Sequence, residues 1–173
     1  MGHPVTNPFL IYSRLPVTPP QIFDLIVAQQ KPVVGHNLFM DLLFLHEKFY
    51  RPLPAKLKDF KKNMNRLLPS IFDTKNMIHR EKRRLEDDLG FNFQTTSLTE
   101  LFQIFDSDKG KVGALYSPVI GYASPGKYNA ENRIPHEAGY DSYLAGYVFL
   151  RLAHLIATRV SISGGLKTSA SRT

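Results

Sequence analysis

The chain has 173 residues and a net charge of +7, and 43% of its residues are hydrophobic. This size suits one domain with a substantial core, and the composition is that of a globular protein. The chain has no cysteine, which excludes a disulfide framework and a thiolate metal site. No apolar run reaches the ~18 residues of a membrane span, and the N-terminus lacks the pattern of a secretory signal. We therefore expect an intracellular protein, in the cytoplasm, the nucleus or both.

The first half of the chain predicts two helices with a short strand between them, and then an amphipathic helix. The first helix is expected over 19–30, with one face formed by Ile22, Leu25 and Ile26. A short strand in 31–37 ends in a glycine turn, and the helix after it runs to about Tyr50. The amphipathic helix covers 56–68, with an apolar stripe of Leu57, Phe60, Met64 and Leu67.

The second half begins with a short buried strand over 70–74 and a charged helix over 75–89 that ends before Gly90. A capping box of Ser97 and Glu100 predicts a helix over 97–105. Residues 106–135 are rich in Gly, Pro, Ser and Asn, so we expect a loop there with one short strand. A long helix over 136–159 and a disordered tail over 160–173 complete the prediction. Strands that alternate with helices imply an α/β fold with a small parallel sheet.

Positive charge is concentrated in segments 56–66 and 75–84. A basic surface favours a polyanionic partner, and nucleic acid is the first candidate. A lysine-rich helix face can equally be a solvated surface without a partner. Charge alone leaves both interpretations open.

Asp41 stands among the apolar residues Leu38, Phe44 and Leu45 of its predicted helix. A bare carboxylate in apolar surroundings is costly unless it is paired or bound to a metal. One interpretation pairs Asp41 with a buried Lys or Arg, or with Asn37 one helical turn earlier. The other places Asp41 at a metal site at the C-terminal edge of the sheet, where α/β folds keep their sites.

Asp141 is likewise surrounded by apolar residues near the start of the last predicted helix, five residues after His136. An acid in the first turns of a helix can simply complement the helix dipole. That explanation suits Glu137 better than Asp141. Asp41, Asp141 and the loop residue His136 are therefore the candidates for a chemical site.

Two segments resemble motifs of a known nuclease family. GHNLFMDLLFL (35–45) and HEAGYD (136–141) resemble the second and third motifs of the DEDD 3′–5′ exonucleases in their histidine-bearing form. The words KPVVGHN, LHEKFYRPLP, DTKNM, SLTELF and PHEAGYDSYLAGY are similar to the poly(A)-specific ribonuclease (PARN) branch of the CAF1 nucleases, and most of all to its piRNA-trimming subgroup. The resemblance covers about residues 20–158. It implies a ribonuclease H-like fold, with a short, mostly parallel sheet flanked by helices, that removes nucleotides one at a time from an RNA 3′ end.

The resemblance also implies a metal site. In the family four acids hold two Mg²⁺ ions, and Asp41 and Asp141 match the third and fourth of them. His136 matches the general base that orients or deprotonates the attacking water.

Four further residues match family positions outside the metal site. Asn37 would support the turn before Asp41, and Lys75 would contact the RNA. Ser97 and Leu98 would line the pocket for the terminal nucleotide. Relatives in the family form homodimers, so a homodimer is a further expectation.

The first family motif, an Asp-x-Glu on the opening strand, has no counterpart before Gly35, where Asp24 is the sole acid. Two carboxylates and a histidine bind at best one hydrated Mg²⁺ weakly. We therefore expect residues 19–159 to be the C-terminal part of an exonuclease domain that lacks its first strands, is inactive alone and follows an irregular segment over 1–18. The alternative is a catalytically dead module that binds RNA or protein through its basic face.

Overall fold

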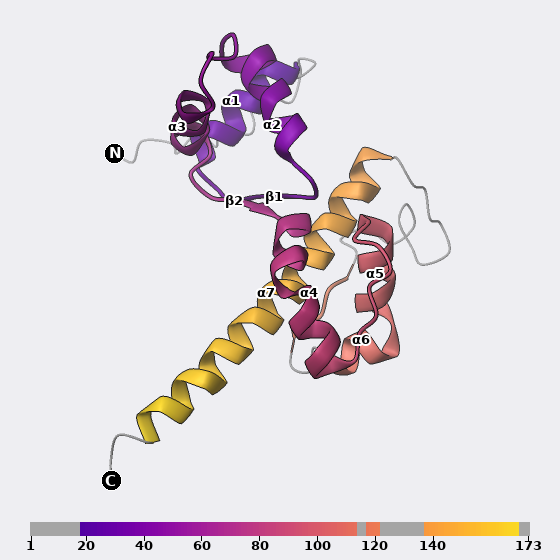
Figure 1. Cartoon of the computed structure of the whole chain (residues 1–173). Helices are drawn as coiled ribbons and strands as arrows, with labels where there is room; N and C mark the ends of the chain where they lie inside the picture. The colour runs from indigo at the N-terminus through magenta and orange to yellow at the C-terminus, as the bar shows by residue number, and fades with distance from the viewer. Residues whose placement is uncertain (1–17, 114–116, 122–136, 170–173) are drawn as a thin grey trace, which may run out of the picture. The chain divides into compact units, whose positions relative to one another are not determined.

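The structure is a computed structural model that describes residues 18–113, 117–121 and 137–169. It divides into two compact units, Met1–Val33 with Phe39–Ser70 and Val34–Leu38 with Ile71–Thr173, which we describe separately. We call them the first and the second unit. Helices and two short strands alternate along the chain (Figure 1). Among the described residues, no helix has the length and apolar character needed to cross a membrane.

The first unit is helical and contains α1 (Pro19–Gln29), α2 (Phe39–Leu45), the π-helix η2 (His46–Tyr50) and α3 (Leu57–Leu67). The predicted stripe of α3 is confirmed at three positions, because Phe60, Met64 and Leu67 are buried, whereas Leu57 is exposed.

The face expected for α1 is exposed rather than buried. Ile22, Leu25 and Ile26 are each more than 40% exposed, and Phe23 is the buried residue of the helix. Phe23 stacks on Phe49 at a ring distance of 5.8 Å, so the docked face is set by this aromatic partner.

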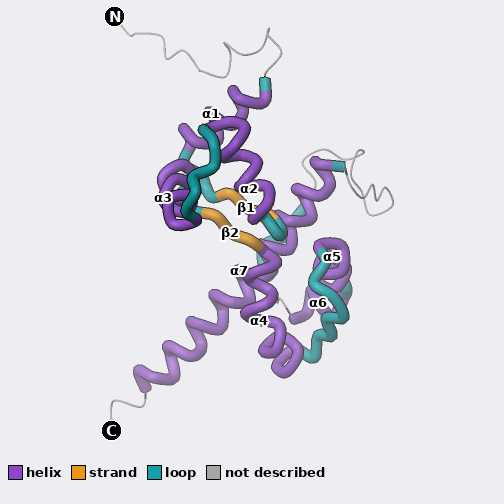
Figure 2. The backbone as a smooth tube through the Cα atoms, turned by 45° about the horizontal axis from the view of Figure 1, so that its top comes forward, coloured by secondary structure: helices purple, strands orange, loops and turns teal. Residues whose placement is uncertain are grey.

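The sheet consists of the parallel strands β1 (Val33–Gly35) and β2 (Ile71–Asp73), which lie side by side in Figure 2. The prediction of a buried second strand is only partly confirmed, since Phe72 is 39% exposed. Its ring contacts Phe149 of α7 (Ala138–Ser169) at 5.0 Å, which places a helix against one face of the strand. The α/β class with a short parallel sheet and flanking helices is confirmed.

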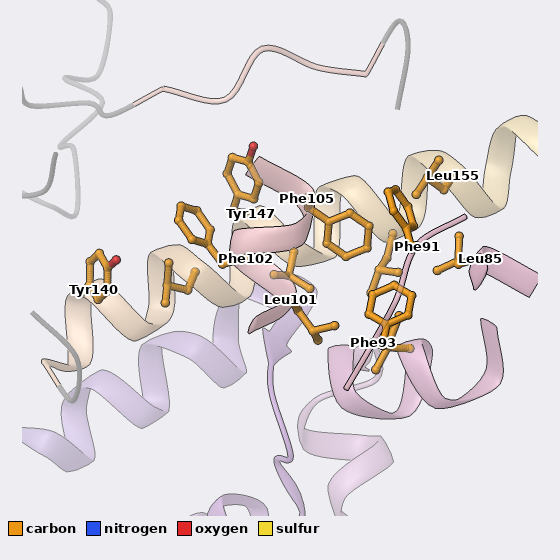
Figure 3. Packing of buried hydrophobic residues seen from close by; sticks show 13 residues of the cluster. Leu85, Phe91, Phe93, Leu101, Phe102, Phe105, Tyr140, Tyr147 and Leu155 are labelled. Atoms are coloured by element: carbon orange, nitrogen blue, oxygen red, sulfur yellow. The ribbon is translucent and has the colours of Figure 1, made fainter. Parts of the chain in front are cut away.

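The core of the second unit lies between α4 (Thr74–Leu89), α5 (Leu98–Asp106) and α7 (Figure 3). Its aromatic centre is Phe105, which is fully buried and meets Phe91 edge-on at 5.8 Å and Phe93 at 6.4 Å. Gly90 ends α4 with φ +60°, as its position after the charged helix predicts. α7 continues to Ser169, so the segment expected to be a disordered tail from 160 is helical up to that residue.

The loop expected over 106–135 begins with a helix, α6 (Asp108–Gly113). Ser107 starts this helix, because its backbone carbonyl accepts the Lys111 N–H at 2.9 Å and its Oγ accepts the Gly110 N–H at 3.1 Å. The prediction of a loop was wrong here because the local Gly, Ser and Lys composition hides a helix that is stabilised by this cap and by packing on α5.

Gly110 and Gly146 predict opposite responses to the same substitution. A Cβ on Gly110 would lie 2.2 Å from the Ile104 carbonyl oxygen and 2.7 Å from Phe105 Cα, so backbone would have to move. A Cβ on Gly146, within α7, would meet no atom within 4 Å. We expect Gly110→Ala to destabilise the protein by about 2 kcal/mol through overpacking. Gly146→Ala should stabilise it by about 0.5–1 kcal/mol through helix propensity.

Chemical denaturation of both variants measures these changes. If the two alanines changed the free energy of unfolding equally, the close packing of Gly110 on α5 would not have the predicted effect on stability.

Candidate functional site

The carboxyl ends of β1 and β2 meet at Asp73, the last residue of β2. Its carboxylate accepts the backbone N–H groups of Asn37 at 2.8 Å and Leu38 at 2.9 Å, in the turn that follows β1. The same carboxylate caps α4 by accepting from Lys75 at 2.9 Å and Asn76 at 3.5 Å. Asp73 therefore joins the turn after one strand to the helix after the other.

The ionised form of Asp73 is favoured by these contacts. Partial burial raises the pKa of the carboxyl, but the four backbone N–H donors outweigh it, and the pKa lies below its ordinary value. Asp73 is not among the site residues predicted from the sequence. An Asp directly before a predicted helix is a typical N-cap, and that signal was present in the sequence.

The turn after β1 differs from the prediction. Asn37 has a left-handed backbone, φ +61°, and lies before α2, which begins at Phe39. Asn37 and Asp41 are therefore not one turn apart on a single helix, and the proposed Asn37–Asp41 pairing is not formed. The Asn37 N–H donates to Asp73, and a role of Asn37 in supporting Asp41 stays a prediction.

His36 connects the strand ends to the start of α5. Its Nδ1 lies 2.9 Å from Thr74 Oγ1, and the Thr74 hydroxyl donates to the Gly35 carbonyl at 3.0 Å. The backbone of Thr96 also hydrogen-bonds to the imidazole. Burial lowers the pKa of His36 below its ordinary value, although the Asp73 carboxylate and the Thr96 backbone oppose this change. His36 thus tethers Thr96, next to the start of α5, to the ends of the strands.

The three predicted substrate contacts are in the second unit and also have structural roles. Lys75 lies in the first turn of α4 and is half-buried. Ser97 caps α5, since its Oγ accepts the Glu100 N–H at 3.3 Å, and Leu98 packs against the core. The Glu100 carboxylate accepts the backbone N–H groups of Gln94 and Thr95 rather than that of Ser97, so the predicted capping box is only half formed. RNA contact by these residues stays a prediction.

Asp41 lies in the first turn of α2 and is exposed, as are most residues of this helix. α2 has no buried residue, and Phe39, Met40 and Phe44 are each more than 50% exposed. The expectation that Asp41 is buried among apolar side chains is therefore wrong. Its carboxylate needs no buried cation to compensate for desolvation, and it is accessible to a ligand.

Asp141 lies in the first turn of α7 and is half-buried. Its N–H donates to the Glu137 carbonyl at 2.9 Å, while the Glu137 carboxylate accepts the Tyr140 N–H at 2.8 Å. Leu144, three residues later, is buried in the core, which fixes the turn that presents Asp141. His136 lies outside the described residues, so its predicted position before this helix stays a prediction.

The ion pairs of the described residues bear on the alternatives for Asp41. In these parts of the chain neither Asp41 nor Asp141 pairs with Lys or Arg, and the ion pairs join Lys82 to Glu86, Arg84 to Glu81 and Lys111 to Asp106. The interpretation of Asp41 as the partner of a buried cation is therefore not supported. No group of three or more His, Asp or Glu side chains that could hold a metal is found within the described ranges. Asp41 and Asp141 belong to different units, and their convergence stays a prediction.

Comparison with known proteins gives a consistent assignment. Residues 17–149 match the CAF1 family ribonucleases. The chain is 41% identical over 144 residues to the poly(A)-specific ribonuclease PNLDC1 of Mus musculus, which covers 83% of this chain and 26% of that protein. It is 36% identical over 136 residues to the pre-piRNA 3′-exonuclease trimmer of Bombyx mori, with 79% and 25% covered.

It is also 30% identical over 136 residues to the poly(A)-specific ribonuclease PARN of Arabidopsis thaliana, with 75% and 19% covered. The chain thus spans about a quarter or less of the length of these curated relatives. The match covers the turn held by Asp73, the start of α5 and the first turns of α7, which are the segments described above. The chain belongs to the CAF1 ribonuclease family, in its PARN-like exoribonuclease branch.

Proposed function

We propose that this chain supplies the second and third acidic motifs of a Mg²⁺-dependent 3′–5′ exoribonuclease that shortens poly(A) or small-RNA 3′ ends. The relatives' names support this class of substrate, since they include poly(A)-specific ribonucleases and a pre-piRNA 3′-exonuclease. The observation that carries the proposal is that Asp41 and Asp141 are free of Lys and Arg partners among the described residues. Carboxylate oxygens of this kind are the ligands that Mg²⁺ prefers.

The proposed roles follow from the chemistry of each side chain. Asp41 and Asp141 would hold Mg²⁺, which would supply a water of lowered pKa and neutralise charge on the scissile phosphate. His136 accepts the proton of the attacking water, a task suited to an imidazole near neutral pH. Lys75 contacts a phosphate of the RNA, and Ser97 and Leu98 contact the terminal nucleotide. The Asp73 cap holds the first turn of α4, which carries Lys75, and the His36 tether holds Thr96, next to Ser97.

We further propose that the 173 residues are inactive on their own, because they contain no Asp-x-Glu motif and supply two of the four family acids. The purified chain should leave a 3′-hydroxyl oligo(A) intact in Mg²⁺. Fusion to a relative's segment that bears Asp-x-Glu should produce a completed domain that shortens the RNA from its 3′ end. A 3′-phosphorylated oligo(A) serves as the control substrate. Mg²⁺-dependent shortening by the chain alone, lost in Asp141→Ala, would contradict the proposed inactivity.

The second candidate is a module that binds RNA or protein and cleaves nothing, which the net charge of +7 and the missing motif favour. It predicts RNA affinity that falls with salt and does not respond to Mg²⁺. An exonuclease site instead predicts a rise in thermal stability with Mg²⁺ or Mn²⁺, through binding to the folded state. We also propose a homodimer, which light scattering over a concentration series tests.

A further inference from the structure

Two arginines of the first unit lie on the same tyrosine ring. Arg51, directly after η2, has its guanidinium 4.5 Å from the centroid of Tyr50. Arg66 of α3 lies 5.8 Å from that centroid and donates a hydrogen bond to the Tyr50 hydroxyl. Cation–π contact and this hydrogen bond hold two positive charges at one place on the surface. We call Tyr50, Arg51 and Arg66 the arginine pair site.

Asn63 and the buried His46 hold Arg51 and the Tyr50 ring in place. Arg51 donates to Asn63 Oδ1 at 2.7 Å, and the amide of Asn63 also lies 3.0 Å from Nε2 of His46. His46 is fully buried and its ring packs edge-on to Tyr50 at 5.2 Å. The π-helical turn makes this possible, since the Arg51 N–H bonds to the His46 carbonyl five residues back at 2.9 Å. Helical segments of this type are rare and are frequently found at functional sites.

The positive charge at this site is not neutralised. In the described part of the chain neither arginine forms an ion pair with a carboxylate. Glu47, the acid of η2, accepts the Leu53 N–H at 2.6 Å instead. Both arginines are exposed, so their fixed positions are not explained by burial in the core.

The site continues along α3 as a row of cations. Lys58, Lys62 and Arg66 are exposed and follow one another at a spacing of four residues, about 6 Å apart along the helix axis. Like charges at this spacing destabilise a helix. Asp59, the acid of α3, pairs with none of them among the described residues. A linear polyanion would relieve this repulsion at several points, which a single small anion would not.

We propose that the arginine pair site, together with Lys58 and Lys62, binds the phosphate backbone of the RNA on which the proposed exonuclease acts. This inference rests on the proposed function. Guanidinium groups bind phosphate oxygens through paired N–H donors, and a preordered guanidinium loses little entropy on binding. The row supplies further contacts along the same strand. Phosphate contacts carry no base readout, so this surface retains the RNA without selecting its sequence.

The test measures RNA binding without catalysis. The full chain is titrated against 5′-labelled oligo(A) in EDTA over a series of salt concentrations. We expect Arg51→Gln with Arg66→Gln to weaken binding about tenfold at about 0.15 M salt and to reduce the slope of log K against log salt by about 1.4, since each phosphate contact to a single strand contributes about 0.7. Lys58→Gln with Lys62→Gln should reduce affinity and slope in the same direction.

A matched control removes the same two charges elsewhere. Arg84→Gln with Lys111→Gln replaces cations that lie 3.2 Å from Glu81 and 3.2 Å from Asp106, and affinity should stay within about twofold. If the control variant and the Arg51/Arg66 variant lost equal RNA affinity, net charge alone would explain the loss, and the inference would be overturned. If the arginine variant loses its far-UV circular dichroism and is therefore unfolded, the RNA affinity of the Lys58/Lys62 variant tests the inference instead.

Other outcomes separate the two proposals. Polyglutamate that competes as well as RNA would point to an acidic protein partner and overturn the RNA assignment. Unchanged binding in both variants, with normal shortening by the completed domain, refutes this inference alone. Loss of binding as predicted, with no shortening by the completed domain, refutes the proposed exonuclease and leaves the RNA surface standing.

Discussion

Replacing Asp73 with alanine is expected to lower the free energy of unfolding by about 2–3 kcal/mol. Loss of the helix cap costs about 1 kcal/mol, and the N–H groups of Asn37 and Leu38 also lose a charged acceptor. For a chain of this size the melting temperature should fall by about 8 °C. Urea denaturation and thermal melting measure the change. The free energy of unfolding of Asp73→Asn should lie between those of the wild type and Asp73→Ala, because asparagine keeps one carbonyl oxygen and loses the charge.

Asp87→Ala is the matched control for this prediction. Asp87 is exposed on the same helix and should change the free energy of unfolding by less than about 0.5 kcal/mol. Since the pKa of Asp73 is lowered in the folded state, its stabilisation is present above the ordinary pKa of 3.8 and is lost as the pH falls through the folded value. The difference between wild type and Asp73→Ala should therefore shrink below about pH 4. A difference that grows on acidification would contradict the assigned contacts.

Replacing Asp41 or Asp141 with asparagine is expected to reduce oligo(A) shortening by the completed domain about 10³-fold. Asparagine keeps the size of the side chain and removes the charge that would hold Mg²⁺ and stabilise the transition state. Neither change should reduce stability by more than about 0.5 kcal/mol, because neither acid is in an ion pair with Lys or Arg among the described residues. Initial rates at saturating Mg²⁺ give the effect on catalysis.

Asp24→Asn and Asp87→Asn are the controls for these two variants. Each removes one exposed acid from the unit that contains Asp41 or Asp141, respectively, and should leave the rate within about twofold. Double replacement of Asp41 and Asp141 should be no worse than either single change, as for groups that act as one unit. Full activity in both single variants would refute the assigned metal ligands.

Most of the helices could be predicted from local patterns. The apolar stripe of α3 and the Gly90 stop of α4 are features that a few neighbouring residues determine. The face of α1 could not be predicted, because burial of Phe23 depends on Phe49, which lies in another helix. α6 was missed for a similar reason. Gly110 allows this helix to pack closely on α5, and that contact cannot be read from the composition of the segment.

Two residues of the candidate site could be named from the sequence, although their roles could not. Asp41 and Asp141 were singled out by their apolar neighbours, the family resemblance then assigned them a role, and each lies in the first turn of a helix. Asp41 is exposed, although its neighbours in sequence predicted apolar surroundings. Asp73 and His36 were missed because their roles come from partners 35 to 38 residues away, which periodicity does not reveal.

The distance in sequence between Asn37 and Asp73, 36 residues, has a consequence for biosynthesis. At the usual pace of about 5–20 residues per second, the ribosome needs a few seconds after making the first of these residues to deliver the second. Until residue 73 has left the ribosome, β1 lacks β2, its partner strand in the described sheet, and the N–H groups of Asn37 and Leu38 lack their carboxylate acceptor. A pause in translation that delays the release of residue 73 from the ribosome would lengthen this interval.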